Sequence, residues 1–382
     1  MIPNSVLNKI NHLARLLGFR TEQDSELYSV STECLTAVAN EIQWLIDDVK
    51  LDGSKLSVSG WAINNFDKRA KDAEFLINGR LFEQVSYPLA SPDLQSIYFN
   101  IPRAKKARFK CQTTVNKDDF RTGFLRLEFA LQVAKGQARR KAWYYPDPEL
   151  ELSLPDESRI KRVIGVPNRT SYIVGGSTIF SRFEAYLKDK LQREYSDFQD
   201  VLDWGCGSAR VSRYFHLFPQ VNLVGVDIDK DNIDWCRKNL KHGSFFAIEL
   251  SPPMEFSDNS FDLIISVSVL THLNEIGQHL WLQELKRISR PNAILMLTIM
   301  GKSIMGLLQT EASTIESVES LGFKVLGHNP DLDDSIGKND HYLNVMHSHD
   351  YIRKEWGRYF TVVDIVPALA ANQDTVVLIN NK

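Results

Sequence analysis

The stretch VLDWGCGSAR, residues 201–210, decides the fold of this chain. A short apolar run ends in the acid Asp203, the glycines Gly205 and Gly207 follow with only Cys206 between them, and a segment able to begin a helix comes next. A strand, a tight turn and a helix start in this order hold a nucleotide-like ligand at the carboxyl end of a parallel sheet. We therefore expect these four residues to contact such a ligand.

A second acid stands at the end of the next predicted strand. The run VGVD, residues 224–227, begins seventeen residues after Gly207 and ends in Asp227. A carboxylate at this place accepts hydrogen bonds from both hydroxyl groups of a ribose. The turn and the second acid together predict an adenosine site, to which we add Ile228, the residue that follows the acid.

One feature of a dinucleotide site is missing. The fingerprint Gly-x-Gly-x-x-Gly ends in a glycine that lets the helix pack close to the strand under a pyrophosphate. Counted from Gly205, that glycine falls at Arg210, and arginine does not fill this packing role. The sequence therefore favours an adenosine ligand of another kind.

The pattern Asp-x-Gly-x-Gly from Asp203 to Gly207 resembles the first motif of the class I S-adenosylmethionine-dependent methyltransferases, in their type 11/12-like group. In that family the glycines bring the main chain close to the amino-acid part of the cofactor, and the acid matched by Asp203 acts near its amino group. The acid at the end of the next strand, matched by Asp227, is the second motif. The resemblance implies that S-adenosylmethionine is the cofactor and that the chain is a methyltransferase.

Further motifs of this family follow in order. The third predicted strand ends at Glu249 and Leu250, where a side-chain acceptor and a main-chain amide would meet the adenine. The run EFSDNSFDLI, residues 255–264, is similar to the family's approach to the fourth strand. That strand leads to Ser266, which the resemblance places beside the cofactor.

The resemblance covers about residues 170–382, where helix and strand patterns alternate. This alternation predicts an α/β fold with a doubly wound, seven-stranded Rossmann-like sheet. A helix is expected over about 178–194, and Asn292, before the fifth strand, can take the positive φ that glycine usually supplies there. The strands are expected at about 199–204, 222–227, 244–249, 261–267, 293–299, 360–366 and 374–379.

A different pattern precedes this part. A period of two from about Ile42 to Val133 predicts a small all-β sandwich without an interrupting helix, and Asp52-Gly53 and Asn78-Gly79 are hairpin signals. An amphipathic helix is expected over residues 5–17. The predicted domains are an N-terminal helical segment (1–40), the β-sandwich (41–135), a linker (136–170) and the methyltransferase domain (171–382).

Composition limits the classes of partner. The chain has 382 residues and a net charge of −3, which gives no electrostatic reason to expect nucleic acid as a partner. No apolar run is long enough for a membrane span, the N-terminus lacks a signal-peptide pattern, and the four cysteines show no pairing pattern. We therefore expect a cytoplasmic protein, with homo-oligomer formation left open.

Three histidines are candidate general bases for methyl transfer to an alcohol, because a base that titrates near neutral pH assists such a nucleophile. His347 and His349 lie in a polar insert between the fifth and sixth strands, and Ser348 or His349 is expected to cap a helix. His272 follows the fourth strand, and Asp374 is a further pocket candidate. A merely polar insert and a structural His272 are the alternatives. Together with His341, the two histidines of the insert could also bind a divalent metal, but their spacing fits no standard zinc pattern, and no metal is assigned.

The N-terminal β-domain and the run HSHDYIRKEW, residues 347–356, resemble a bacterial group of these methyltransferases that often accompany glycan-assembly enzymes. This implies O-methylation of a sugar, glycan or natural-product hydroxyl. Trp61, Trp143, Tyr144 and Tyr145 could stack on a sugar ring, although Trp61 fits the core of a sandwich better. The alternatives are protein methylation with the β-domain as a docking module, and a non-catalytic adaptor that binds the cofactor.

Overall fold

The structure is a computed structural model. It describes residues 43–63, 73–97, 102–133, 137–150, 152–308, 310–330 and 342–382. The helix expected over 5–17 and the histidine at 341 lie outside the described residues. Among the residues described, no helix is both long and apolar enough to cross a membrane.

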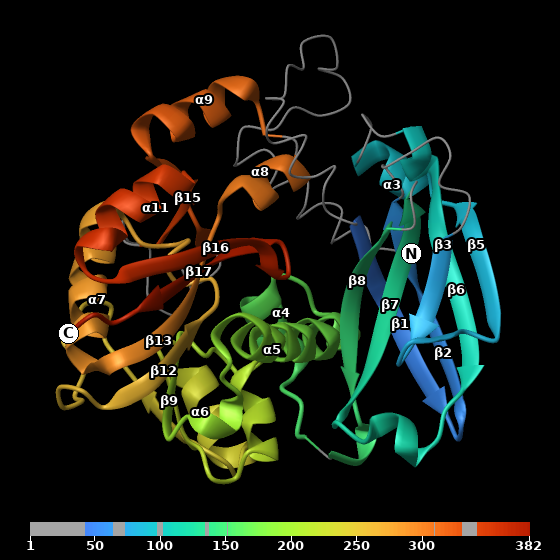
Figure 1. Cartoon of the computed structure of the whole chain (residues 1–382), viewed down its shortest axis with the longest axis horizontal. Helices are drawn as coiled ribbons and strands as arrows, with labels where there is room; N and C mark the ends of the chain where they lie inside the picture. Colours follow the sequence, from blue (N-terminus) through green and yellow to red (C-terminus); the bar gives the residue numbers. More distant parts are fainter. Residues whose placement is uncertain are drawn as a thin grey trace.

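The N-terminal part consists of two four-stranded antiparallel sheets that share one core (Figure 1). Aromatic side chains from both sheets meet in that core, among them Trp44 and Phe109 from one sheet and Phe75 and Phe129 from the other. The first sheet has the order β1-β2-β6-β5 and the second β4-β3-β7-β8. The strands are β1 (Gln43–Asp52), β2 (Lys55–Ile63), β3 (Ala73–Ile77), β4 (Arg80–Leu81), β5 (Gln84–Ala90), β6 (Lys106–Thr114), β7 (Phe124–Val133) and β8 (Gln137–Pro146).

The structure has both hairpin turns that the sequence predicts in this part, but its elements differ from the prediction elsewhere. Asn78 and Gly79 connect β3 to β4 with φ values of 47° and 82°, as a hairpin turn of this type requires. The turn between β1 and β2 lies one residue later than expected, at residues 53–54. Two expectations were wrong. The short helix α3 (Pro92–Ile97) interrupts the strands, and β8 occupies the start of the expected linker because it pairs with β7 along its whole length.

Helix α5 (Arg169–Leu191) joins the two parts of the chain (Figure 1). It begins nine residues before the expected start, with Asn168 as its N-cap. Its side chains bind the main chain of the edge strand β8. The Tyr144 N–H donates to Thr178 Oγ1 (2.9 Å), Ser177 Oγ donates to the Tyr144 carbonyl (2.6 Å), and Arg182 Nη2 donates to the Ala142 carbonyl (2.6 Å). These bonds cover an edge that would otherwise expose unpaired main-chain groups.

The C-terminal part is the expected α/β fold with a seven-stranded sheet in the order β11-β10-β9-β12-β13-β17-β16. In this sheet β11, β10, β9, β12 and β13 are parallel to one another. Strand β17 is antiparallel to both its neighbours, β13 and β16. Apolar side chains of α5 and α6 (Lys230–Asn239) pack on one face, and those of α7 (Glu275–Ile288) and α11 (His349–Glu355) pack on the other. The strands are β9 (Asp200–Trp204), β10 (Asn222–Asp227), β11 (Ser244–Ala247), β12 (Phe261–Ser266), β13 (Ser289–Ile299), β16 (Thr361–Ala370) and β17 (Gln373–Ile379).

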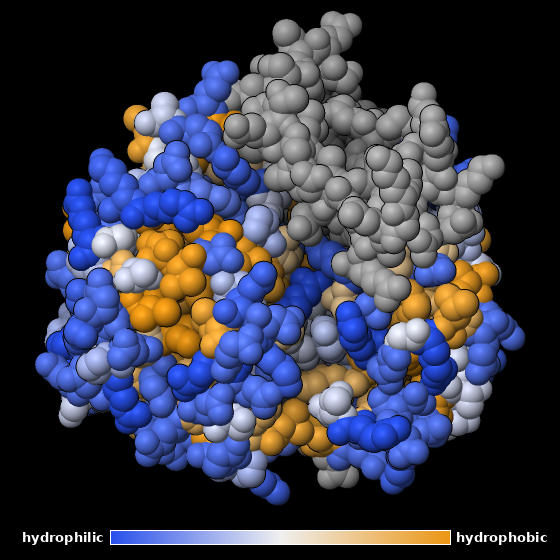
Figure 2. Space-filling view, in the orientation of Figure 1, coloured by the Kyte–Doolittle hydropathy of each residue, from blue (hydrophilic) through white to orange (hydrophobic). Residues whose placement is uncertain are grey.

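The edge of this sheet that β16 forms lies at the surface. On the face shown in Figure 2, apolar side chains gather over β16 and β17, and Val363 of β16 is exposed. Asn292, in the irregular first part of β13, has a φ of 63°, which confirms its expected conformation. Its N–H donates to the carbonyl of Asn380 (2.8 Å), so this part of β13 is also held to the last residues of the chain.

The insert between β13 and β16 adds a small layer of its own. It contains α8 (Lys302–Leu307), α9 (Ala312–Leu321), the antiparallel pair β14 (Phe323–His328) and β15 (Leu343–His347), and then α11. Ser348 is the N-cap of α11, because its Oγ accepts a hydrogen bond from the Tyr351 N–H (3.1 Å). This confirms the expected helix start and brings the insert back onto the sheet.

The candidate cofactor site and its rim

The glycine turn after β9 is bound to the neighbouring strand β10. The main-chain N–H groups of Gly205 and Cys206 donate to the Val226 carbonyl (2.8 and 3.0 Å), and the Gly207 N–H donates to Asp227 Oδ2 (2.7 Å). Gly205 has a φ of 78°, and a Cβ atom there would lie 2.0 Å from Val269 Cγ2. Both the conformation and the space therefore require glycine at residue 205.

The turn is not followed by the α-helix expected there. A 3₁₀ helix over Ser212–Leu217 takes its place, and Ala209 adopts a φ of 56°. The Cys206 thiol is buried, and burial raises its pKa well above the ordinary value. Burial thus argues against a reactive thiolate at Cys206, and its contact with a ligand stays a prediction.

Two acids, the buried Asp203 and the half-buried Asp227, stand at the carboxyl ends of β9 and β10. Asp203 is almost fully buried, and this desolvation raises the pKa of its carboxyl to about 7, with a further contribution from the negative charge of Asp227. Desolvation also raises the pKa of Asp227 to about 6. A cationic ligand stabilises the ionised form of such acids. The pair therefore suits a molecule with an ammonium or a sulfonium group.

Asp227 is also placed to receive hydroxyl groups. Its Oδ2 accepts from the Gly207 N–H and its Oδ1 from the Asp229 N–H (2.8 Å), which holds the carboxylate in one orientation. Each carboxylate oxygen has a second lone pair that can accept from a ribose hydroxyl. The residues present thus fit S-adenosylmethionine at both its cationic end and its ribose.

The remaining expected contacts lie around the same ends of the strands. Ile228 is half-buried after β10, and Glu249 is exposed after β11. The Leu250 carbonyl accepts from Trp281 Nε1 (3.2 Å), which fixes its peptide. Ser266 ends β12 and is buried, and its Oγ has no hydrogen-bond partner among the described residues. Their contact with the cofactor stays a prediction.

Helix α4 (Glu157–Ile164) covers the glycine turn. The helix was not expected from the sequence, because its segment was assigned to a linker. A Cβ atom on Gly207 would lie 3.0 Å from Val163 Cγ2, and Arg162 Nη1 pairs with the buried Asp229 Oδ2 (3.0 Å). Asp156 caps the helix by accepting from the N–H groups of the second and third residues after it. An aspartate directly before an amphipathic run is the sequence signal that could have revealed α4.

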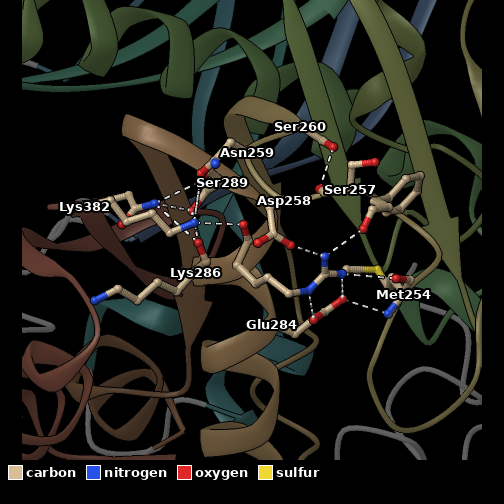
Figure 3. Close-up of polar contacts among 12 residues, drawn as sticks. Met254, Ser257, Asp258, Asn259, Ser260, Glu284, Lys286, Ser289 and Lys382 are labelled. Atoms are coloured by element: carbon tan, nitrogen blue, oxygen red, sulfur yellow. Dashed lines mark hydrogen bonds and ion pairs between the residues drawn. The ribbon is translucent and has the colours of Figure 1, made fainter.

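The run that resembles the approach to the fourth strand is held by α7 (Figure 3). Glu284 Oε1 accepts from the Met254 N–H (2.7 Å), and Arg287 pairs with both Glu284 and Asp258 at 2.8 Å. At the end of the chain, Lys382 Nζ donates to Asn259 Oδ1 (2.9 Å). These contacts lie before β12 begins, so they position this strand without lining the cofactor turn.

The structure corrects the expectation that His347 is a general base. Its side chain is fully buried, Gln278 lies within hydrogen-bond distance of its Nε2, and the rings of Phe323 and Trp356 pack around it. Burial lowers its pKa to about 3. A base must reach its substrate, so this geometry assigns His347 to the core of the insert.

His272 connects the loop after β12 to the insert. Its Nδ1 lies 2.8 Å from the Leu343 carbonyl, to which it can only donate, and its ring stacks on Tyr342 with centroids 4.5 Å apart. Next to this contact, the main-chain N–H groups of Leu343 and Val345 donate to the carbonyls of His272 and Thr271. The arrangement gives His272 a clear structural role at the rim of the site.

His349 and Asp374 form a pair at the same end of the sheet. His349 Nε2 lies 2.8 Å from Asp374 Oδ2, and the Asp374 side chain is fully buried. Asp374 lies opposite Ile299, the last residue of β13. Gly301 leaves room for the pair, because a Cβ atom there would lie 2.3 Å from Asp374 Oδ2 and 3.2 Å from His349 Nε2. The structure thus joins two residues that the sequence singled out separately.

The four aromatic residues that could stack on a sugar ring are buried or half-buried. Trp61 and Trp143 are buried in the β-rich part, and Trp143 Nε1 donates to the Trp44 carbonyl (3.1 Å). Tyr144 and Tyr145 are half-buried, and desolvation raises the pKa of each phenol. The burial of Trp61 agrees with its favoured place in the core of the sandwich, whereas stacking on a sugar ring is corrected for Trp143. Within the described ranges, no group of three or more His, Cys, Asp or Glu side chains could hold a metal ion.

Comparison with known proteins supports the assignment of the C-terminal part. Residues 202–297 match the family model described as a methyltransferase domain. An uncharacterized protein of Methanocaldococcus jannaschii is 31% identical over 102 residues, which are 27% of this chain and 41% of that protein. The chain thus aligns with less than half of this relative's length.

Solved structures were also found. A protein from Pyrococcus horikoshii has 16% identity and a TM-score of 0.38, and it covers 54% of this chain and 91% of its own. The magnesium protoporphyrin IX methyltransferase of Synechocystis, solved with S-adenosylhomocysteine, has 15% identity, a TM-score of 0.37 and coverage of 55% and 86%. The family match over 202–297 coincides with the turn and the two acids. The chain therefore contains a class I S-adenosylmethionine-dependent methyltransferase domain, whose cofactor is S-adenosylmethionine.

Proposed function

We propose that this chain transfers a methyl group to a hydroxyl of a sugar, a glycan or a natural product, with His349 as the general base. The observation that carries the proposal is the His349–Asp374 pair. It combines an imidazole with a buried carboxylate 2.8 Å away, at the end of the sheet where the cofactor turn also lies. An imidazole held by a carboxylate is an arrangement that serves proton abstraction in many enzymes.

The pair explains how the proton would move. S-adenosylmethionine supplies, when bound, a methyl group on a sulfonium that is an excellent leaving group. Asp374 accepts the hydrogen of His349 Nε2, which leaves the lone pair of Nδ1 for the hydroxyl proton of the acceptor. As the oxygen–carbon bond forms and the sulfur–carbon bond breaks, His349 takes that proton. Asp374 then faces an imidazolium, whose positive charge its carboxylate stabilises.

Asp374 is built to hold one orientation. Its Oδ2 meets His349, and its Oδ1 lies 3.3 Å from the Ala368 N–H, which donates to it. Ala368 itself has a φ of 49°, within an irregular part of β16 where the register with β17 shifts. The carboxylate therefore connects the insert to the two last strands of the sheet. Much of the rate would come from this alignment of base and acceptor.

The acceptor class rests on resemblance and on charge. The bacterial group that this chain resembles often accompanies glycan-assembly enzymes, and the net charge of −3 gives no reason to prefer nucleic acid. A cytoplasmic location, a homo-oligomer and docking of a protein substrate on the β-rich part stay predictions of the sequence. Measured methyl transfer would separate an enzyme from a non-catalytic adaptor.

The test uses the full chain with isotopically labelled S-adenosylmethionine and a panel of simple alcohols and glycosides. His349→Asn and Asp374→Asn should lower the rate of methyl transfer by about 10²–10⁴-fold, the usual contribution of a general base. Both variants should bind S-adenosylhomocysteine within about threefold of the parent chain. Full activity of His349→Asn would exclude the proposed base. Cofactor binding with no transfer to any alcohol would favour the adaptor or a protein acceptor.

A further inference from the structure

Arg210 follows the glycine turn, and its side chain runs along helix α5. A Cβ atom on Gly176 would lie 2.9 Å from Arg210 Cγ, and a Cβ atom on Gly175 would lie 3.9 Å from its Nη1. Gly176 therefore leaves space for the stem of the arginine, and Gly175 lies beside its charged end. The guanidinium is also close enough to Asp203 for the two charges to interact. Arg210 thus places a positive charge near the acid that suits a cationic ligand.

The guanidinium of Arg210 has no partner of its own in the protein. It forms no hydrogen bond and no ion pair with any other described residue, although the arginine is half-buried. Desolvation lowers the pKa of this guanidinium. A guanidinium carries five N–H donors, and withdrawing it from water without acceptors is unfavourable. A ligand that brings an anionic acceptor to this place would recover that cost.

The nearby Arg213 shows what an arginine with a structural role looks like in this fold. It is only 4% exposed, its Nη2 donates to the Ser153 carbonyl, and its guanidinium lies over the rings of Tyr172 and Trp235. Its Nε and Nη1 are fully enclosed. None of the three side-chain nitrogens of Arg210 is enclosed in this way. Solvent, and therefore a ligand, can reach Arg210 but not the inner nitrogens of Arg213.

The amino-acid end of S-adenosylmethionine needs two opposite charges from its site, because its ammonium and its carboxylate are attached to the same carbon atom. Asp203 suits the ammonium. The carboxylate then lies next to it and requires a cation on the same side of the turn. Arginine is well suited to this task, since its planar fork donates two parallel N–H bonds to a carboxylate.

We propose that Arg210 binds the α-carboxylate of S-adenosylmethionine and so selects a ligand with a complete amino-acid end. The residue that departs from the dinucleotide fingerprint thereby becomes a contact of the cofactor. The inference rests on the identity of the cofactor and not on the nature of the methyl acceptor. Its failure would leave the proposed methylation of a hydroxyl untouched.

The test compares two ligands of the full chain by calorimetry. One is S-adenosylhomocysteine, and the other is its decarboxylated analogue, 5′-deoxy-5′-(3-aminopropylthio)adenosine, which keeps the ammonium and lacks the carboxylate. The parent chain should bind S-adenosylhomocysteine about 10–100-fold more tightly, the usual range for hydrogen bonds to a charged group. Equal affinity of the parent chain for the two ligands would overturn the inference without any variant.

Variants assign the preference to Arg210. Arg210→Met keeps a stem that fills the space at Gly176, and it should reduce the preference to about one by weakening S-adenosylhomocysteine alone. Arg210→Lys keeps the charge without the fork and should retain part of the preference. Arg121→Gln removes an exposed arginine of the β-rich part and is the matched control, whose two affinities should equal those of the parent.

Two further outcomes separate binding from an indirect effect. If Arg210 only favours the ionised form of Asp203, Arg210→Met should weaken both ligands equally and leave their ratio unchanged, which would contradict the proposed contact. Because the guanidinium has no partner to lose, the melting temperature of the ligand-free Arg210→Met protein should stay within about 3 °C of the parent. A larger fall would assign Arg210 to the support of the turn, and the preference retained by Arg210→Lys would then decide whether it also binds the carboxylate.

Discussion

Gly176 of α5 lies against the main chain of Arg210, so closely that a Cβ atom on Gly176 would be 2.1 Å from the Arg210 carbonyl oxygen. Arg210 occupies the place where a dinucleotide fingerprint has its third glycine, which allows a helix to pack close. In this chain the close approach is made by another helix, and the glycine that permits it belongs to that helix. The cofactor turn is therefore held by α5, which also binds the β-rich part of the chain.

Gly176→Ala should disturb this contact, whereas Gly175→Ala should not. A Cβ atom on Gly175 would lie 3.9 Å from its nearest neighbour, an ordinary contact distance, and alanine in a helix interior is about 1 kcal/mol more favourable than glycine. We expect Gly175→Ala to raise the melting temperature and Gly176→Ala to lower it and weaken cofactor binding. Thermal unfolding and calorimetry with S-adenosylhomocysteine measure both. Similar behaviour of the two variants would mean that the helix–turn contact is not tight.

Cofactor affinity should rise with pH. Desolvation raises the pKa of Asp203 to about 7 and that of Asp227 to about 6, and a cationic ligand favours their ionised forms. Binding should therefore weaken as the pH falls from about 8 to about 5.5 and should release protons near pH 6. Calorimetry in buffers of different ionisation enthalpy counts these protons. Adenosine, which lacks the ammonium group, is the control and should depend less on pH. An affinity independent of pH would show that the acids are already ionised in the free site.

Asp203→Asn should stabilise the cofactor-free protein at alkaline pH. Because the folded pKa of Asp203 lies above its ordinary value of 3.8, the native state holds a proton that the unfolded state loses. The contribution of Asp203 to stability thus falls as the pH rises from about 4 to about 7, by about 1.4 kcal/mol for each pH unit in this window. Asparagine removes this cost, so the gain in the free energy of unfolding should be largest near pH 8 and vanish near pH 4. The same variant should lose cofactor affinity.

His347 should make the protein sensitive to acid without acting in catalysis. Burial lowers the pKa of His347 to about 3. Below pH 6.5, the ordinary pKa of histidine, the unfolded state therefore binds a proton that the native state does not bind. The stability that depends on neutral His347 is present above about pH 6.5 and is lost as the pH falls toward about 3. His347→Gln should flatten this slope in denaturant unfolding at several pH values. It should keep methyl transfer at neutral pH, in contrast to His349→Asn; loss of turnover in a folded His347→Gln protein would restore His347 as a candidate base.

Features carried by neighbouring residues could be predicted from the sequence. The glycine turn, the two acids at the strand ends and the seven strands follow from residues close together in the chain, and the structure has them in the expected order. Asn292 and the Asn78-Gly79 turn take the conformations that their residue types favour. Such features depend on local sterics and on the hydrophobic period of a segment, which a single sequence displays directly.

The misjudged features depend on contacts between distant segments. The strand β8 looks like a linker by its composition, and it forms because β7 offers a partner. Helix α4 lies over Gly207 although about forty residues separate them, and the residues of neither segment predict this contact. Burial is equally non-local. His347 and His349 differ by two residues, yet one is enclosed by aromatic rings and the other meets a carboxylate on β17.

By itself, the sequence determined the class of fold, the cofactor turn and the kind of ligand that the turn accepts, since each is encoded within a few consecutive residues. Only the tertiary structure decided which histidine meets an acid and which helix covers the turn. Those relations are set by the packing of the sheet, whose strands bring the ends of remote segments to one edge.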